Sequence, residues 1–314
     1  MPESAQGAAD YILPLYMNGL TGRMLKAPST TKKQREILLI YGHHAMLERW
    51  WSLVENLRPY GNVTMPDLPG FGGMESFYKI GIKPDIDAYA DYLAAFIKLR
   101  YKRKRVSIYA ISFGFVVVTR MLQLYPELAK KVDILVSAVG FMKNDDFHWS
   151  SRRQFGYRLF TRLLATAPLS LAIRYFFLNK AVIRYLTQHL SHSKHRFIEV
   201  TPAEFEENLN FEVRLWQAND VRTHWLTTGQ FFTLDNTKVH IALPVVHIVS
   251  KGDHYFNNTT VEQHMRQVFM NYQKFTSTSK AHTPHITADK QAAAVMVPPG
   301  LRKLLAKKPN KVKV

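Results

Sequence analysis

The chain has 314 residues, of which 46% are apolar and 12% aromatic, enough to fill a large core and to exclude a disordered chain. It has no cysteine, which excludes a disulfide scaffold, a thiolate metal site and a cysteine nucleophile. The formal net charge of +18 favours a partner that carries negative charge, either nucleic acid or anionic lipid.

The first half of the chain alternates predicted strands and helices. Residues 11–25 predict one or two short strands with a turn near Asn18 and Gly19. Residues 36–41 form a continuous apolar run, typical of a strand that is buried on both faces. The alternation continues with a helix at 46–57, a strand at 62–65, a helix at 85–100, a strand at 106–111, a helix at 113–124 and a strand at 132–139.

After a long interruption the strands resume at residues 244–250 and 272–276, and helices at 259–270 and 287–295 flank the last strand. Strands that alternate with helices predict an α/β protein with a mostly parallel sheet and helices on both faces.

The interruption, residues 141–240, has a helical pattern and is predicted to form a cap, or lid, over the carboxyl edge of the sheet. In open α/β sheets ligands bind at this edge. Residues 1–140 and 241–300 would then form the core, and residues 301–314 a basic C-terminal tail that we expect to be mobile.

The N-terminus lacks a charged start followed by an apolar stretch, so we expect no secretory signal peptide. The longest uncharged apolar run in the middle of the chain, residues 163–173, has 11 residues, whereas a spanning helix needs about 20. We therefore expect a cytoplasmic protein without a transmembrane helix, either in solution or lying on a membrane surface.

Ser112 stands between a predicted strand and a predicted helix, with Ala110 two residues before it and Gly114 two residues after it. This pattern is typical of a nucleophile elbow, a sharp turn that requires small neighbours and lifts the serine hydroxyl above the sheet. The usual pattern is G-x-S-x-G, and Ala110 replaces its first glycine. The alternative is that Ser112 only caps the N-terminus of the helix.

Two further motifs follow predicted strands, Gly-His-His at residues 42–44 and Asp-Leu-Pro-Gly-Phe-Gly at residues 67–72. Together with the serine elbow they closely resemble the α/β-hydrolase superfamily, over about residues 10–140 and 240–297. Tyr41 stands where that family usually has a histidine. The resemblance implies that the backbone N–H groups of His43 and Phe113 form an oxyanion hole.

A serine hydroxyl is a poor nucleophile at neutral pH, so it needs a base, and the base needs an acid that orients it. In the family the chain order is serine, acid, histidine. Asp253 follows the strand predicted at 244–250, and His282 follows the last strand, 29 residues later. The sequence Ala-His-Thr-Pro around His282 resembles the terminal turn of the family, and His285 is the alternative base.

The resemblance predicts a serine hydrolase that cleaves a carboxylic ester, or a related acyl bond, of a hydrophobic substrate. Members of the fold that open epoxides or displace halide use an aspartate at the elbow, so Ser112 indicates acyl chemistry. His44, Tyr255 and Phe256 flank the predicted site and are candidates for the substrate pocket. The alternative is a catalytically silent binding protein of the same fold.

No metal-ligand spacing such as H-E-x-x-H occurs in the chain, so we predict no metal and no cofactor. The oligomeric state does not follow from the sequence.

The positive charge is concentrated in three segments without Asp or Glu. Residues 147–198 hold nine cations, and residues 98–105 and 302–313 hold six each. No recognised nucleic-acid motif accompanies these segments, so nucleic acid is the least favoured partner.

Within the cap, Arg158 and Arg162 lie one turn apart on a predicted helix, and Leu159, Phe160 and Leu163 lie on its other side. A basic amphipathic helix of this kind is typical of a segment that lies on an anionic membrane. The alternative is a cap that packs its apolar side on the sheet and exposes only its arginines to water.

Overall fold

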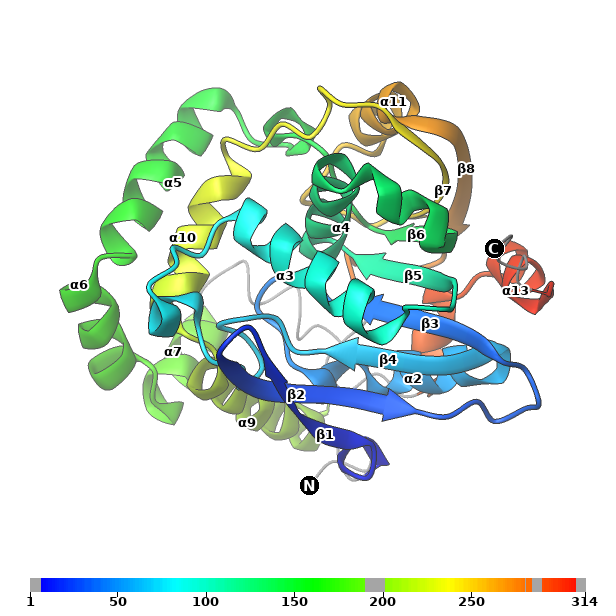
Figure 1. The fold of residues 1–314 in the computed structure, drawn as a ribbon. Helices are drawn as coiled ribbons and strands as arrows, with labels where there is room; N and C mark the ends of the chain where they lie inside the picture. Colours follow the sequence, from blue (N-terminus) through cyan, green and yellow to red (C-terminus); the bar gives the residue numbers. More distant parts are fainter. Residues whose placement is uncertain (1–6, 190–200, 280, 284–289, 309–314) are drawn as a thin grey trace.

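The computed structural model describes residues 7–189, 201–279, 281–283 and 290–308. They form a sheet of eight strands in the spatial order β1-β2-β4-β3-β5-β6-β7-β8 (Figure 1). The strands are β1 (Ile12–Met17), β2 (Leu20–Ala27), β3 (Arg35–Ile40), β4 (Gly61–Pro66), β5 (Val106–Ile111), β6 (Val132–Ala138), β7 (Ile241–Ser250) and β8 (Phe269–Ser277). The pairs β1–β2 and β2–β4 are antiparallel and all others are parallel, which confirms the predicted mostly parallel sheet.

The antiparallel edge starts with a hairpin whose turn lies where the sequence predicts it. Asn18 and Gly19 join β1 to β2, and their φ angles are 52° and 77°. A two-residue turn with both φ angles positive matches the right-handed twist of the flanking strands, and Asn-Gly adopts it readily. The hairpin therefore follows from local sequence.

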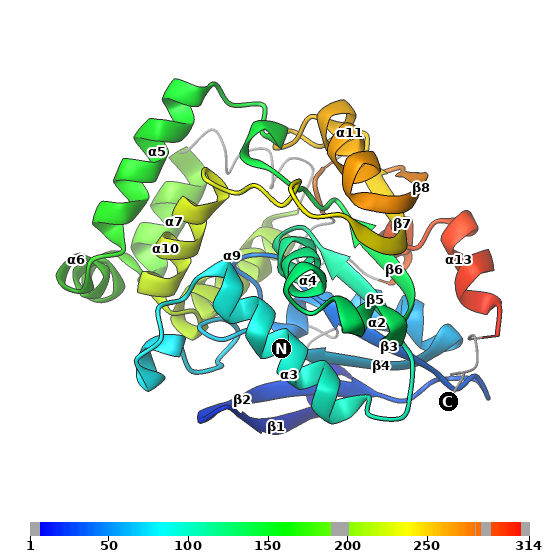
Figure 2. The ribbon, with the colours of Figure 1, turned by 45° about the horizontal axis from the view of Figure 1, so that its top comes forward.

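Helices cover both faces of the sheet. Helices α3 (Ile86–Arg100) and α4 (Phe113–Leu124) lie side by side on one face, and α2 (Trp51–Leu57) and α12 (Lys290–Ala293) lie on the other (Figures 1 and 2). The central strand β5 is buried along its whole length, which explains its nearly continuous apolar sequence.

Helix α11 (Asn258–Val268) joins β7 to β8, and the chain also forms several short 3₁₀ segments. These segments are η1 (Leu47–Trp50), η2 (Arg58–Tyr60), η3 (Phe77–Ile80), η4 (Pro126–Lys131), η5 (Asn144–Asp146) and η7 (Ala294–Met296).

Between β6 and β7 the chain forms a group of helices at the end of the sheet toward which the parallel strands point (Figure 1). They are α5 (Ser151–Leu164), α6 (Ala167–Ala172), the π-helical turn η6 (Ile173–Phe177), α7 (Lys180–His189), α9 (Pro202–Ala218) and α10 (Val221–Phe231). In both views α5 and α6 are outermost, and α10 lies between them and the sheet (Figures 1 and 2). None of the described helices has the length and apolar content needed to cross a membrane.

The C-terminal segment differs from the predicted mobile tail at 301–314. It continues the fold as helix α13 (Pro299–Ala306), with Leu301 and Leu305 buried one turn apart. The buried guanidinium of Arg35 donates hydrogen bonds to the carbonyl oxygens of Leu305 (3.2 Å) and Lys307 (2.6 Å). The many lysines of this segment obscure a short amphipathic helix, and residues 309–314 lie outside the described residues.

Arg35 also pairs with the buried carboxylate of Asp133, and it donates to the Ser107 hydroxyl at 2.7 Å. We predict that Arg35→Ala lowers the free energy of unfolding by about 3–5 kcal/mol, because it removes the buried guanidinium that faces these acceptors. Urea unfolding followed by circular dichroism measures the change. The matched control is Arg120→Ala, which breaks a largely exposed pair with Asp87 and should cost about 1 kcal/mol or less. Equal costs would contradict the anchoring role of Arg35.

Candidate active site

Ser112 alone forms the turn between β5 and α4. Its φ and ψ angles are 48° and −115°, a conformation that a residue with a side chain rarely adopts. A backbone outlier of this kind costs on the order of 1–3 kcal/mol and persists only where its surroundings hold it. Here the Ser112 N–H donates to the carbonyl oxygen of Ala138 at the end of β6, at 2.9 Å.

The hydroxyl of Ser112 makes no capping hydrogen bond to α4, so the interpretation of this residue as a simple helix cap is wrong. The tight turn also explains Gly114, because a Cβ there would lie 2.5 Å from the carbonyl oxygen of Ile40. Ala110, the departure from the usual motif, is fully buried within β5. The structure thus has the sharp strand-to-helix turn that the sequence predicts at Ser112.

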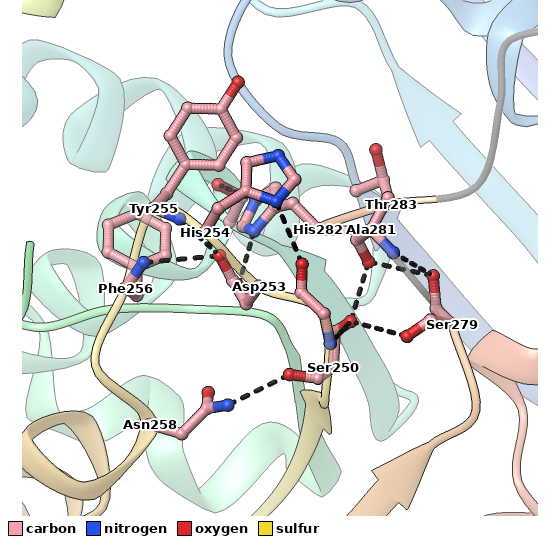
Figure 3. Close-up of polar contacts among 12 residues, drawn as sticks. Ser250, Asp253, His254, Tyr255, Phe256, Asn258, Ser279, Ala281, His282 and Thr283 are labelled. Carbon is pink, nitrogen blue, oxygen red and sulfur yellow. Dashed lines mark hydrogen bonds and ion pairs between the residues drawn. The ribbon is translucent and has the colours of Figure 1, made fainter. Parts of the chain in front are cut away.

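The side chains of Ser112, His282 and Asp253 form one hydrogen-bonded chain. His282 Nε2 lies 3.1 Å from Ser112 Oγ, and His282 Nδ1 lies 2.7 Å from Asp253 Oδ2. The Asp253 side chain is 2% exposed and that of His282 14%. Figure 3 shows Asp253 and His282 approaching each other from the loops that follow β7 and β8. The alternative base, His285, lies outside the described residues.

Asp253 is held by its own loop as well as by His282. Its Oδ1 accepts hydrogen bonds from the backbone N–H groups of Tyr255 (2.9 Å) and Phe256 (3.3 Å), which leaves Oδ2 for the imidazole (Figure 3). Burial alone would raise the pKa of Asp253, but the hydrogen bonds and the charge interaction with His282 lower that pKa below its ordinary value. The carboxylate is therefore ionised at neutral pH.

Two serines that the sequence reasoning missed join the loop of Asp253 to the loop of His282. Ser250 Oγ lies at the end of β7 and donates to the carbonyl oxygens of Ala281 (2.7 Å) and Ser279 (3.1 Å), as Figure 3 shows. Ser279 Oγ also donates to the Ala281 carbonyl oxygen, at 2.8 Å. Ala281, the residue before His282, is thus held against the end of β7, and Asp253 follows three residues after that end.

The two predicted oxyanion donors belong to residues that lie next to each other. Phe113 is the first residue of α4, and the first N–H groups of a helix have no partner within it. The His43 ring lies 5.6 Å from the Phe113 ring, and its Nε2 lies 2.8 Å from Thr227 Oγ1 of α10. Burial lowers the pKa of His43 to about 3, so this ring is neutral at neutral pH.

The three pocket candidates lie in different places. The rings of Tyr255 and Phe256 lie 5.3 and 5.4 Å from the His282 ring, centre to centre. His44 instead faces α9, where its ring lies 4.0 Å from the Trp216 ring and its Nδ1 lies 3.0 Å from Asn219 Nδ2.

Aromatic side chains extend from His282 into the helices between β6 and β7. We call the group of Phe113, Phe141, Phe147, Phe231 and Phe256 the aromatic wall. The Phe141 ring stacks on the Phe256 ring at 4.4 Å and meets the Phe231 ring of α10 at 5.6 Å, which in turn lies 5.5 Å from the Phe113 ring. Sequence reasoning missed Phe141 and Phe231 because isolated phenylalanines do not indicate which side of a fold they face.

The Asp67–Gly72 motif is explained by its contacts with Tyr41. The Tyr41 hydroxyl donates to Asp67 Oδ1 at 2.9 Å and accepts the Leu68 N–H at 2.8 Å. A Cβ at Gly72 would lie 1.9 Å from the same Asp67 oxygen, so only glycine fits. The tyrosine that replaces the usual histidine therefore fixes this loop next to the candidate site.

One group of side chains has the donor types of a metal site. Ligand atoms of Asp145, Asp146 and His264 lie within 4.8 Å of one another. Asp146 accepts hydrogen bonds from the N–H groups of Met142 (2.7 Å) and Lys143 (3.0 Å), and its Oδ1 lies 2.7 Å from His264 Nδ1. These bonds account for the buried carboxylate as a structural support of the chain after β6.

Comparison with known proteins finds no matching family model and no matching curated sequence. Solved structures do match over nearly the whole chain. A candidate lipase from Acinetobacter baumannii is 18% identical with a TM-score of 0.67, and the match covers 96% of each chain. An esterase from Thermogutta terrifontis is 15% identical (TM-score 0.61, 94% of this chain and 96% of the other), and a hydrolase from Oleispira antarctica is 13% identical (TM-score 0.62, 91% and 94%). This chain therefore has the α/β-hydrolase fold.

Proposed function

We propose that this protein is a serine hydrolase that cleaves a carboxylic ester, or a related acyl bond, of a hydrophobic substrate. The observation that carries the proposal is the hydrogen-bonded chain from Ser112 Oγ through His282 to Asp253, at a serine held in a strained turn. A strained serine next to a base that is itself oriented by a buried acid is the arrangement that activates a hydroxyl.

In the proposed mechanism Ser112 Oγ attacks the substrate carbonyl carbon while His282 Nε2 takes the hydroxyl proton. Asp253 keeps the imidazole in position and stabilises its charged form. The N–H groups of His43 and Phe113 bind the oxyanion, and each such donor typically contributes about 3 kcal/mol to the transition state. His282 then gives the proton to the leaving alcohol, and water, activated by the same histidine, releases the acid from the acyl-enzyme.

The proposed substrate class rests on the side chains that surround Ser112 and His282. The aromatic wall packs beside the His282 ring and continues to Phe231 on α10, so the surroundings of the proposed site are apolar. The names of the matching structures, a candidate lipase and an esterase, support the same class. We further propose that residues 141–240 act as a cap that contributes Phe147 and Phe231 to the pocket.

The first prediction concerns the nucleophile. Ser112→Ala should abolish the hydrolysis of p-nitrophenyl butyrate, because no other residue would supply the attacking oxygen. The thermal unfolding curve should keep its cooperative shape, since the change removes one oxygen atom. Turnover equal to that of the parent protein, from a sample free of contaminating esterase, would contradict the assignment.

The second prediction concerns the base. His282→Ala should lose about as much of kcat as Ser112→Ala, because members of such a unit act together. His285→Ala is the matched control three residues away and should lose far less. A larger loss in the His285 variant would transfer the role of base to His285.

The third prediction concerns Ser250, a positioning residue that does not touch substrate. Ser250→Ala removes both hydrogen bonds to the loop of His282, and we expect kcat to fall about tenfold with KM little changed, because the base is misplaced. Ser250→Thr keeps a hydroxyl and should restore much of kcat. Ser107→Ala changes a buried serine at the opposite end of the sheet and should leave kcat unchanged. An unchanged kcat in Ser250→Ala would mean that the bonds only stabilise the fold.

A further inference from the structure

The outer helices of the cap expose an unusual number of large apolar side chains. Phe155 is 61% exposed, Leu163 58% and Phe176 72%. We call the group to which they belong the outer cap face. It consists of Phe155, Leu159, Phe160 and Leu163 of α5, Leu171 of α6, and Tyr175, Phe176 and Phe177 of η6.

Helix α5 has its polar side inward, the reverse of an ordinary surface helix. Its buried residues are Gln154 and Thr161, and Gln154 donates to the carbonyl oxygens of Asn144 and Trp149, both at 3.0 Å. On the other side Phe155, Leu159 and Leu163 follow one another at intervals of four residues, so they form one exposed stripe. One alternative from the sequence is a cap that packs its apolar side on the sheet and exposes only its arginines. The structure contradicts this alternative for α5, because the stripe is exposed.

The outer cap face points away from the rest of the molecule. Helix α5 packs on α10 through Thr161 and through Phe160, whose ring lies 6.0 Å from the Trp225 ring, and α5 and α6 form the outermost edge in both ribbon views (Figures 1 and 2). No described element covers the stripe. Its apolar area is therefore presented to whatever lies next to the protein.

The segment that carries this apolar face is basic. Residues 147–198 contain no Asp or Glu. Arg152 and Arg162 are exposed on α5, and within the described ranges neither forms an ion pair, whereas Lys180 and Arg184 of α7 pair with Glu206 of α9. Arg153 stacks over the Trp149 ring at 4.4 Å.

A basic groove lies directly beside the C-terminal end of α5. Its volume is about 380 Å³, and its lining includes Lys83, Arg162 and Arg222 but no carboxylate. Ile82, at the same groove, is 44% exposed. Three cations around a cavity of this size could accept the phosphate or carboxylate of a lipid headgroup.

We propose that the outer cap face docks this protein on an anionic lipid bilayer, with the apolar stripe in the headgroup–acyl boundary and the cations at the headgroups. Apolar burial together with attraction to anionic lipid is the combination that holds an amphipathic helix at a membrane surface. A second copy of the chain fits less well, because a two-fold contact centred on the stripe would bring the arginines of one copy, Arg152 and Arg162, near those of the other. The proposal does not depend on the proposed esterase activity.

The test is co-sedimentation of the full chain with vesicles, in the absence of any ester substrate. One set of vesicles contains phosphatidylcholine alone, and the other contains equal parts of phosphatidylcholine and phosphatidylserine. We expect tighter binding to the anionic set and weaker binding in high salt, since exposed charges are screened over about 10 Å at 0.1 M salt.

Two double variants separate the two parts of the face. Arg152→Glu with Arg162→Glu should weaken binding to anionic vesicles by about 30-fold or more, since each cation at a membrane surface contributes about a fivefold factor. Phe155→Ser with Leu159→Ser should weaken binding by about tenfold or more, because serine side chains gain no free energy from transfer out of water into the apolar part of the bilayer.

Each double variant has a control in which the same kind of substitution is made elsewhere on the surface. Lys102→Glu with Arg103→Glu changes the net charge equally but lies in the exposed loop before β5. Leu99→Ser with Met270→Ser removes side chains that are 58% and 54% exposed. Both controls should bind anionic vesicles nearly as well as the parent. Hydrolysis of a short soluble ester and the thermal unfolding curve show in every variant whether the core is intact.

Equal vesicle binding by the parent and both cap variants would overturn the proposal. The proposal would also be overturned if analytical ultracentrifugation showed a concentration-dependent dimer that the Phe155/Leu159 change abolishes, and if at the same time no variant affected vesicle binding. Tighter binding to a single-stranded oligonucleotide than to anionic vesicles, lost in the Arg152/Arg162 change, would assign the face to nucleic acid instead. A parent protein that binds vesicles but hydrolyses no ester would refute the proposed function and leave the membrane proposal standing.

Discussion

The site depends on one backbone turn, the change from β5 to α4 at Ser112. A residue with a side chain adopts a φ of 48° there because the β6 backbone accepts its N–H and because Gly114 lets α4 approach β3. The turn directs the hydroxyl away from capping α4. It also starts α4 at Phe113, whose N–H has no partner within the helix, so one constraint supplies both the nucleophile and one oxyanion donor of the proposed mechanism.

Around this fixed point the other groups come from loops that the parallel sheet collects at one edge. Asp253 follows β7 and His282 follows β8, and these strands pair in parallel up to Ser250 and Ser277. The Ser250 hydroxyl then joins the two loops, so the positions of Asp253 and His282 are coupled through a few hydrogen bonds. Two further segments are fixed separately, the 67–72 loop by Tyr41 on Asp67 and the 42–44 loop by His43 on Thr227 of α10.

The strands and the strand-to-helix turn at Ser112 could be predicted because their signals are local. Continuous apolar runs, an Asn-Gly turn and small residues around Ser112 each reflect a physical requirement of a few neighbouring positions. Helix α13 was missed because most of the lysines of residues 301–314 follow it and dominate the segment, while within the helix only Leu301 and Leu305 show the helical spacing. Ser250, Phe141 and Phe231 were missed because their roles arise only when distant segments meet.

The orientation of α5 is the clearest case in which sequence pattern was ambiguous. The spacing of apolar residues in α5 predicts an amphipathic helix, but it does not determine which side of the helix packs on the protein. The interior provides polar partners for Gln154 after β6, and this selects the polar side as the buried one. The structure thus combines a conventional buried core with an outer layer whose apolar side faces outward.

If Ser112 is a nucleophile activated by His282, as we propose, it should react with a fluorophosphonate, which forms a covalent bond to an activated serine oxygen. The intact protein is treated with the reagent, digested and mapped by mass spectrometry, beside Ser112→Ala and His282→Ala samples. We expect a single adduct on the peptide that contains Ser112, absent from the first variant and formed much more slowly in the second. No adduct on the parent protein, or an adduct on another residue that survives in Ser112→Ala, would show that Ser112 is not the activated serine.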